Sequence, residues 1–245
     1  MKIEAILTPA ELPAPARRDL RDAVCVVFDV LRATSTFVTA LHNGAKAVLP
    51  VSEIAEALAL RKKQPDVLLG GERDSVRIRA AQTGGIDFDL GNSPREYTPE
   101  KVRGKTVVST TTNGTRALRA CTGAKTVLAA SFLNLTATVN FIKKLQPAQV
   151  LLVCAGTREN TALEDVLAAG ALCEMLLGEF SDSAEIARRV YAQAKPNLAG
   201  AVRSSENAQR LLAIPELRDD VPFCLQRDVC PLIAKMEADG SVRRR

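Results

Sequence analysis

The chain has no tryptophan, two tyrosines and a single histidine among its 245 residues. Aromatic residues make up 4% of the sequence, so the stacking platforms with which proteins hold single-stranded nucleic acid are scarce. The lone histidine, His42, excludes paired catalytic histidines and a histidine-rich metal site. A metal would therefore have to be held mainly by oxygen ligands, which favours Mg²⁺ or Mn²⁺ over zinc.

Long apolar runs and paired cysteines are missing as well. No run reaches the roughly 18 residues that a membrane-spanning helix needs, and the segment from Met1 to Leu7 is patterned as a first strand rather than as a signal peptide. The six cysteines form no Cys-x-x-Cys pair, which argues against a zinc site and against a disulfide framework. We therefore expect a cytoplasmic protein that does not bind a membrane.

The positive charge of the chain is poorly organised. Of the formal net charge of +5, three charges belong to Arg243, Arg244 and Arg245 at the C-terminus. We expect no nucleic-acid binding, because arginines placed singly after predicted strands suit a small polyanionic ligand better. Common phosphate-handling motifs are also absent: there is no G-x-x-x-x-G-K-[ST] loop, and no cysteine is followed six positions later by arginine.

Strand and helix patterns alternate along most of the chain. Such alternation is typical of βαβ units, and it predicts a single α/β domain, residues 1–245, of three-layer α/β/α type with a mainly parallel (mixed) sheet. The part at about 160–245 is expected to be mostly helical, and residues 74–105 to form a long loop. We expect strands near 2–7, 24–29, 46–50, 67–70, 106–109, 125–129 and 149–153, and helices near 33–43, 52–63, 114–121, 134–145, 163–178 and 182–194.

An internal similarity favours a diverged duplication. The segments 44–52 and 123–131 share six of nine residues at a constant offset of 79 positions, and the same offset lays 29–36 over 108–115. A generic helix stop followed by a strand would explain part of this pattern. We favour two βαβαβ half-repeats, at about 24–72 and 103–156, whose equivalent strand ends would face one cleft.

Four predicted strands end in unusual polar segments: 29–36, 70–74, 110–116 and 154–160. In open α/β sheets, ligands bind outside the carboxyl ends of the strands. The segment 110–116 also leads into a predicted helix, whose first N–H groups and dipole suit phosphate. The four strand ends together predict a phosphate-and-metal site at one rim of the fold.

The charged residues beside these turns admit a structural interpretation as well as a functional one. The guanidinium groups of Arg32 and Arg73 would bind phosphate or carboxylate, or form surface salt bridges. The nearby carboxylates would bind a metal, or would cap helices and complement helix dipoles. These carboxylates are Asp29, Glu72, Asp89, Glu164 and Asp165.

Five motifs follow one another along the chain: Asp29-Val30-Leu31-Arg32-Ala33-Thr34, Gly70-Gly71-Glu72-Arg73, Asn92-Ser93-Pro94-x-Glu96-Tyr97, Thr110-Thr111-Thr112-Asn113-Gly114-Thr115-Arg116-Ala117 and Ala155-Gly156-Thr157. In this order they resemble the 2-phosphosulfolactate phosphatase family, over nearly the whole chain to about residue 228. The resemblance implies a Mg²⁺-dependent phosphoric monoester hydrolase that converts 2-phospho-3-sulfolactate to 3-sulfolactate and phosphate, a step toward coenzyme M in organisms that make it.

The resemblance also implies roles for individual residues. Asp29, Glu72 and Asp165 would be Mg²⁺ ligands, directly or through water, and Asp29, Arg32, Glu72 and Arg73 would be catalytic. Substrate would be bound by Thr111, Thr112, Asn113, Gly114, Thr115, Arg116, Asn92, Ser93 and Arg158, with Arg116 or Arg158 meeting the sulfonate or carboxylate. Direct attack by water and a phosphoenzyme on Asp29 both stay open.

Two departures from the family pattern concern the substrate. Residues 74–87 form a longer segment than expected, which would reshape the pocket over the end of the substrate that lacks phosphate. Ser205-Glu206-Asn207 stands where family members often have a Ser-x-His segment. The alternatives are a phosphatase for another phosphorylated hydroxy acid, and a non-catalytic sensor or carrier of a phosphorylated metabolite. The oligomeric state is open, with a homo-oligomer among the options.

Overall fold

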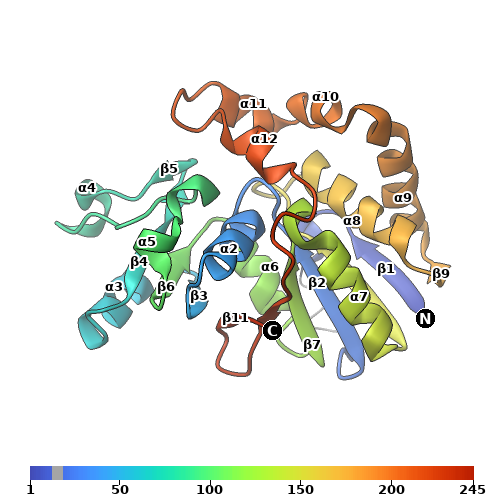
Figure 1. The fold of residues 1–245 in the computed structure, drawn as a ribbon, viewed down its shortest axis with the longest axis horizontal. Helices are drawn as coiled ribbons and strands as arrows, with labels where there is room; N and C mark the ends of the chain where they lie inside the picture. Colours follow the sequence, from blue (N-terminus) through green and yellow to red (C-terminus); the bar gives the residue numbers. More distant parts are fainter. Residues whose placement is uncertain (13–18) are drawn as a thin grey trace.

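Eleven strands form one sheet in the computed structural model, which describes residues 1–12 and 19–245 (Figure 1). The seven strands expected from the sequence are all present, each within a few residues of its predicted bounds. The strands are β1 (Lys2–Ile6), β2 (Ala23–Phe28), β3 (Ala47–Val51), β4 (Leu68–Arg73), β5 (Val76–Arg77), β6 (Thr106–Thr110), β7 (Thr126–Ala130), β8 (Gln149–Cys154), β9 (Glu179–Phe180), β10 (Ala234–Met236) and β11 (Val242–Arg244).

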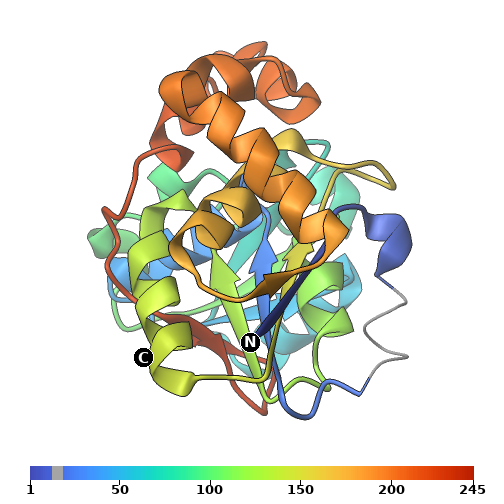
Figure 2. The same cartoon turned by 90° about the vertical axis from the view of Figure 1, so that its right-hand side faces the viewer.

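Helices cover both faces of the sheet, as the prediction of three α/β/α layers requires (Figure 2). The helices are α2 (Ala33–His42), α3 (Ile54–Lys63), α4 (Ala80–Thr83), α5 (Pro99–Val102), α6 (Gly114–Ala120), α7 (Leu135–Leu145), α8 (Leu163–Met175), α9 (Asp182–Ala194), α10 (Leu198–Arg203), α11 (Glu206–Leu212) and α12 (Asp220–Cys224). The expected loop at 74–105 instead contains β5, α4 and α5, together with a short 3₁₀ turn at Pro94–Glu96.

Strand β2 lies at the centre of the packing. All six of its residues are buried, which is typical of a parallel strand covered on both faces. Its alternate side chains point to opposite faces: Val24, Val26 and Phe28 pack with α7, α8 and α9, whereas Cys25 and Val27 pack with α2 and α6. Helix α3 packs separately against β3, β4 and β6.

The sheet consists of two parallel blocks that run in opposite directions. Strands β4, β6 and β3 form one block, with β5 antiparallel to β4 at its outer edge, and β7, β2, β8, β1 and β9 form the other. Between them lies the antiparallel hairpin β10–β11, in which β11 pairs with β3 and β10 pairs with β7. The sheet is therefore mixed, and the last residues of the chain complete its centre.

The part after residue 160 is mostly helical, as expected, but it also supplies this hairpin, which was not predicted. Each of its strands is three residues long and carries basic side chains, among them Lys235 and Arg243. Segments of three residues are too short to show the alternation of apolar and polar residues by which a strand is predicted. They become strands because the gap between β3 and β7 offers backbone hydrogen-bonding partners on both sides.

The two expected half-repeats are interleaved in the sheet. When β2, β3 and β4 are matched with β6, β7 and β8, the order β4-β6-β3 corresponds to β8-β2-β7 on the other side of the hairpin. The first strand of each half thus lies between the second and third strands of the other half. The halves are not separate units, and their duplication stays a prediction.

The twist of the sheet brings the carboxyl ends of both blocks together. Five strand-to-strand steps separate β6 from β2, and a twist of roughly 20–25° per step accumulates to about 100–125°. The twist therefore turns the strands of the two blocks, which run in opposite directions on either side of the hairpin, so that their carboxyl ends approach each other. Helices α10, α11 and α12 lie across this end of the molecule (Figure 1).

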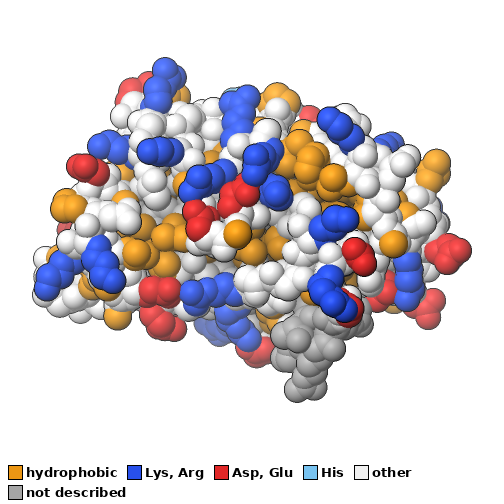
Figure 3. All heavy atoms as spheres, turned by 90° about the horizontal axis from the view of Figure 1, so that it is seen from below, with side chains coloured by type: hydrophobic (Ala, Val, Ile, Leu, Met, Phe, Trp, Pro, Cys, Tyr) orange, Lys and Arg blue, Asp and Glu red, His pale blue; other side chains and the backbone are white. Residues whose placement is uncertain are grey.

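The surface of the molecule mixes charges of both signs. On the face shown in Figure 3, Lys and Arg side chains are interspersed with acidic and apolar ones. No helix in the described part of the chain is both long and apolar enough to cross a membrane.

Candidate active site

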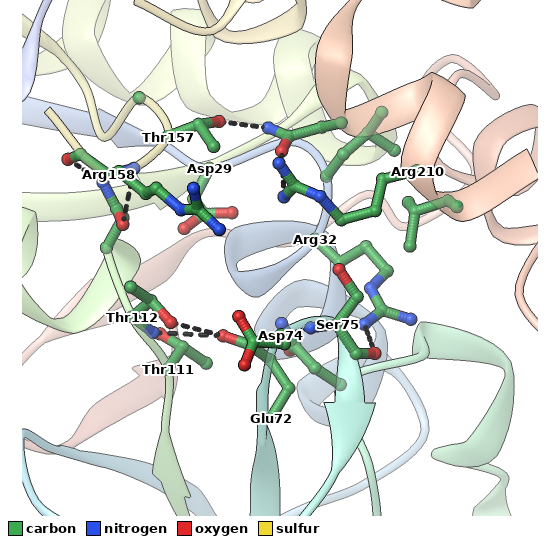
Figure 4. A pocket seen from close by; sticks show the side chains of 16 residues that line it. Asp29, Arg32, Glu72, Asp74, Ser75, Thr111, Thr112, Thr157, Arg158 and Arg210 are labelled. Atoms are coloured by element: carbon green, nitrogen blue, oxygen red, sulfur yellow. Dashed lines mark hydrogen bonds between the residues drawn. The ribbon is translucent and has the colours of Figure 1, made fainter. Parts of the chain in front are cut away.

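One cavity is lined by the residues that follow β2, β4, β6 and β8 (Figure 4). The four polar strand ends are therefore brought to one place, although they span more than a hundred positions of sequence. Eight of the site residues named from the sequence line this cavity: Asp29, Arg32, Glu72, Asn92, Thr111, Thr112, Asn113 and Arg158. Leu31, Asp74, Ser75, Gly156, Thr157, Asn207, Arg210 and Leu211 complete the lining.

Asp29 lies between the N-termini of two helices. Its Oδ1 accepts a hydrogen bond of 2.9 Å from the N–H of Ala33, the first residue of α2. Its Oδ2 lies against Gly114, the first residue of α6, where a Cβ atom would be only 2.6 Å away from that oxygen. The carboxylate therefore faces the positive ends of two helix dipoles, and Gly114 is required there because any side chain would displace it.

Burial determines the ionisation of Asp29. Desolvation is the largest cause that raises the pKa of this carboxyl, and the negative charges of Glu72 and Glu164 also raise it, whereas the hydrogen bond from Ala33 and the charge of Arg32 lower it. The net result is a pKa of about 7. A cation bound in the cavity would favour the ionised form. Asp29 is thus a carboxyl whose protonation responds to what the cavity contains.

Glu72 holds two of the strand ends together. Its Oε1 accepts hydrogen bonds from the N–H (3.1 Å) and the hydroxyl (3.0 Å) of Thr112, and its Oε2 accepts one of 2.9 Å from the N–H of Ser75. The side chain thereby joins the turn after β4 to the turn after β6. Because Oε1 already accepts two hydrogen bonds, it is Oε2 that keeps a further lone pair for a ligand in the cavity.

Asn113 forms the corresponding link between β6 and β8. Its side-chain amide donates to the carbonyl oxygens of Ala155 (3.0 Å) and Arg158 (2.9 Å), and its Oδ1 accepts from the N–H of Arg158 (3.2 Å). Two buried hydroxyls brace the same turn, because Thr111 Oγ1 and Thr115 Oγ1 lie 3.3 Å apart. The turn before α6 is therefore tied to the backbone that carries Arg158.

Asp165, predicted as a metal ligand, has a different position. Both of its oxygens accept backbone hydrogen bonds, from Val30 (2.8 Å) and Gly156 (3.0 Å), and it does not line the cavity. Burial and the nearby charge of Asp29 raise its pKa well above the ordinary value. Asp165 positions the turns that carry Asp29 and Thr157, and its geometry does not support direct metal binding.

The arginines expected to bind phosphate are mostly engaged elsewhere. Arg32 is buried, with its Nη1 2.8 Å from Asp220 Oδ2 and its Nη2 donating to the carbonyl oxygen of Ser75 (2.6 Å). Arg73 turns away from the cavity and donates to Thr110 Oγ1 (3.0 Å) and to the carbonyl oxygen of Glu72 (2.7 Å). The phosphate-binding role predicted for Arg73 is not supported by this position.

Arg116 and Ser93 also lie outside the cavity lining. Arg116 is exposed and pairs with Glu159 at 2.9 Å, so its position does not support contact with the substrate. Ser93 donates a hydrogen bond of 2.6 Å to Asp220, the same carboxylate that holds Arg32. Ser93 therefore supports the cavity wall from behind.

Two arginines extend into the cavity without a carboxylate partner among the described residues. Arg158 comes from the turn after β8, and Arg210 comes from α11 (Figure 4). The guanidinium of Arg210 donates to Asn207 Oδ1 at 3.2 Å. Arg210 was not identified from the sequence, and Asn207 was noted only as a departure from a family pattern. Their spacing of i, i+3 within a helix capped by Ser205 was the available signal.

The cavity offers oxygen ligands of the kind that Mg²⁺ prefers. Asn92 Oδ1 is buried and has no hydrogen-bonding partner among the described residues, and it lines the same cavity as Asp29 and Glu72. The described residues contain no cluster of three or more His, Cys, Asp or Glu side chains that would form a complete cage. Mg²⁺ usually takes one or two carboxylates and completes its shell with water and substrate phosphate, so the residues fit this ion.

Comparison with known proteins agrees with the five motifs. The family model described as 2-phosphosulpholactate phosphatase matches residues 6–239. The chain is 42% identical to a probable 2-phosphosulfolactate phosphatase of Caldanaerobacter subterraneus subsp. tengcongensis over 233 residues, 92% of each chain. It is 43% identical over 205 residues to a protein of the same name from Thermotoga petrophila (83% of this chain, 85% of that protein), and 32% identical over 238 residues to one from Clostridium novyi (95% and 96%). The resemblance is thus confirmed, and the chain belongs to the 2-phosphosulfolactate phosphatase family.

Proposed function

We propose that this protein is a Mg²⁺-dependent phosphoric monoester hydrolase that converts 2-phospho-3-sulfolactate to 3-sulfolactate and phosphate. Its relatives carry the name of this activity. The observation that carries the proposal is the position of Asp29, a buried carboxylate at the N-termini of α2 and α6. Its cavity also holds two arginines that have no carboxylate partner among the described residues.

The phosphate end of the substrate is assigned to the turn after β6. Asp29 contacts Gly114, Asn113 binds the backbone of Arg158, and Arg158 extends into the same cavity. A guanidinium and the start of a helix both favour the dianionic phosphate. Arg158 thus takes the place that sequence reasoning gave to Arg32 and Arg73, whose guanidinium groups are engaged by other protein groups.

The cation would be held by Asp29 and Glu72, with Asn92 Oδ1 as a neutral oxygen ligand. Bound Mg²⁺ supplies Lewis-acid polarisation of the phosphoryl oxygens. The fixed charges of Arg158 and the helix ends stabilise the charge that develops on the same oxygens, and they do so without reorganising, because hydrogen bonds to the backbone already hold the turns.

The overall reaction breaks the P–O bond to the C2 oxygen. Water supplies the oxygen that phosphorus gains and the proton that turns the C2 oxygen into the hydroxyl of 3-sulfolactate. Asp29 serves two routes equally well: it accepts a proton from an attacking water, or it attacks phosphorus itself and is released by water afterwards. Acid-quenched single turnovers separate the two, because only the second route transfers phosphate to the protein.

Phosphate release from a panel of phosphorylated hydroxy acids, with Mg²⁺ or with EDTA, tests the proposal. We expect the highest kcat/KM with 2-phospho-3-sulfolactate, and no turnover in EDTA. Asp29→Ala should abolish turnover while leaving the unfolding temperature close to that of the wild type. Asp74→Ala, which removes an exposed carboxylate from the same cavity, is the control and should keep most of the activity.

Two results would overturn the proposal. A higher kcat/KM for another phosphorylated hydroxy acid would change the substrate but keep the reaction. Inactivity across the panel, combined with tight binding of one phosphorylated acid, would identify a sensor or carrier instead.

A further inference from the structure

We propose that Arg210 and Asn207, on α11, form the subsite that binds the sulfonate of the substrate. The inference rests on the proposed function, since it assigns one end of the substrate of that reaction to a wall of the same cavity. It concerns residues that lie some 50 positions beyond the last motif used to recognise the family.

Helix α11 is built to present these two side chains to the cavity. Ser205 caps the helix, with its hydroxyl oxygen accepting a hydrogen bond from the N–H of Ala208 (3.3 Å). Asn207, Arg210 and Leu211 stand at positions i, i+3 and i+4, so they share one helix face. All three line the cavity.

The amide of Asn207 has one chemically possible orientation. Its Nδ2 donates to Thr157 Oγ1 (2.5 Å) and to Glu164 Oε1 (2.6 Å), and its Oδ1 accepts from Arg210 Nη1. A carboxylate only accepts and a guanidinium only donates, so reversing the amide would lose both contacts. Because Glu164 is 1% exposed, the amide is anchored to a rigid group, and it holds Arg210 at a defined place.

Arg210 is the cation whose charge is left for a ligand on this wall. Arg32, the other arginine nearby, is already neutralised by Asp220. Among the described residues, the guanidinium of Arg210 hydrogen-bonds to the neutral amide of Asn207 and forms no ion pair. Figure 4 shows it entering from α11, across the cavity from Thr111 and Thr112, which belong to the phosphate end.

The layout of the substrate matches that of the cavity. Phosphate and carboxylate share C2 of the substrate, whereas the sulfonate is on C3 and extends away from the P–O bond that breaks. A cation opposite the phosphate end therefore meets the sulfonate rather than the carboxylate. Two donors of one guanidinium also suit a group with three equivalent oxygens.

The test compares Arg210→Met with the wild type on two substrates, 2-phospho-3-sulfolactate and 2-phospholactate, which lacks only the sulfonate. We expect kcat/KM for the first to fall about 10- to 100-fold, the loss of a charge-assisted contact, and that for the second to change less than twofold. Arg203→Met removes the same charge from neighbouring α10, outside the cavity, and should change neither.

A second variant tests the role of Asn207 in positioning. Asn207→Ala leaves the guanidinium in place but removes its anchor. It should therefore raise KM for 2-phospho-3-sulfolactate several-fold with little change in kcat, and leave the kinetics of 2-phospholactate unchanged. Arg210→Met should unfold within about 2 °C of the wild type. Asn207→Ala also removes the amide donor of the buried Glu164 carboxylate, so it should unfold about 2–12 °C lower.

If Arg210→Met lowers kcat/KM equally for both substrates, or for neither, the proposed sulfonate subsite is wrong. Arg210 would then bind the phosphate or the carboxylate, or would not bind the substrate at all. If the wild type hydrolyses neither substrate, the proposed reaction fails, and calorimetric titration with 3-sulfolactate and with lactate decides the subsite alone. Tighter binding of 3-sulfolactate that Arg210→Met abolishes would support it, and equal or absent binding would overturn it.

Discussion

The buried ion pair between Arg32 and Asp220 provides a prediction whose magnitude follows from the structure. The side chains of the two residues are 2% and 0% exposed, and their atoms Nη1 and Oδ2 lie 2.8 Å apart. Ser93 donates to the second oxygen of Asp220 at 2.6 Å. Asp220→Ala would leave the guanidinium of Arg32 buried with the carbonyl oxygen of Ser75 as its remaining partner.

Removing one partner of a buried ion pair costs about 3–5 kcal/mol, because the other charge stays desolvated. For a chain of this size, 1 kcal/mol shifts the unfolding temperature by about 2–4 °C. Asp220→Ala should therefore unfold about 6–20 °C below the wild type. It should also lower activity, since Arg32 lines the cavity and Asp220 holds its guanidinium.

Differential scanning calorimetry measures this shift, and the neighbouring residue provides the control. Asp219 is 65% exposed and lies 3.4 Å from Arg95, a surface pair worth about 0–1 kcal/mol, so Asp219→Ala should shift the temperature by less than about 4 °C. Replacing both Arg32 and Asp220 by leucine should recover most of the stability, while the activity stays lowered. If Asp220→Ala unfolds within 2 °C of the wild type, the pair does not act as a desolvated unit.

Three further predictions concern the cavity and the core. Gly114→Ala should lower kcat/KM at least about tenfold by displacing Asp29. Its control, Gly123→Ala, has no atom within 4 Å of the added carbon and should be fully active. Equal activities of the two variants would contradict the contact between Gly114 and Asp29. The pKa of Asp29 is raised to about 7 in the folded protein, above its unfolded value of 3.8. Between these values the folded chain keeps a proton on Asp29 that the unfolded chain has lost. The free energy of unfolding in EDTA should therefore fall as the pH rises from about 4 to 7. Asp29→Asn should lack this fall. The difference in free energy of unfolding between the wild type and this variant, measured by urea unfolding, should therefore change by about 3 kcal/mol between pH 5 and pH 8. If the free energies of the two proteins change in parallel with pH, the raised pKa of Asp29 is refuted. All six cysteines are buried, so the native protein should react with a thiol reagent far more slowly than the urea-unfolded protein, and rapid native labelling would contradict the packing.

The strand–helix order of the chain was predictable because it depends on short-range patterns. A buried strand such as β2 is a continuous apolar run, and its neighbours in sequence reveal it without knowledge of its partners. The polar strand ends were predictable for the same reason. Their convergence in one cavity was predicted from the rule that ligands bind at the carboxyl ends of strands. The two blocks of strands run in opposite directions, however, so it is the twist of the sheet that brings these ends together.

Arg73 shows how a small error in a strand boundary misplaces a side chain. The strand was expected to end near residue 70, which put both Glu72 and Arg73 in a turn. In the structure β4 continues to Arg73, and successive side chains of a strand point to opposite faces. With Glu72 facing the cavity, Arg73 must face away from it.

By itself the sequence determined the order of the elements, the polar turns and the family, because each is encoded by residues close together in the chain. Only the tertiary structure decided which charges are free to act. The partner of Arg32 lies 188 positions away along the chain. Arg210 reaches the cavity from helix α11, which the pattern of strands and helices in the sequence did not predict. Such pairings depend on how distant segments pack, and packing is a property of the whole folded chain that no local pattern of residues contains.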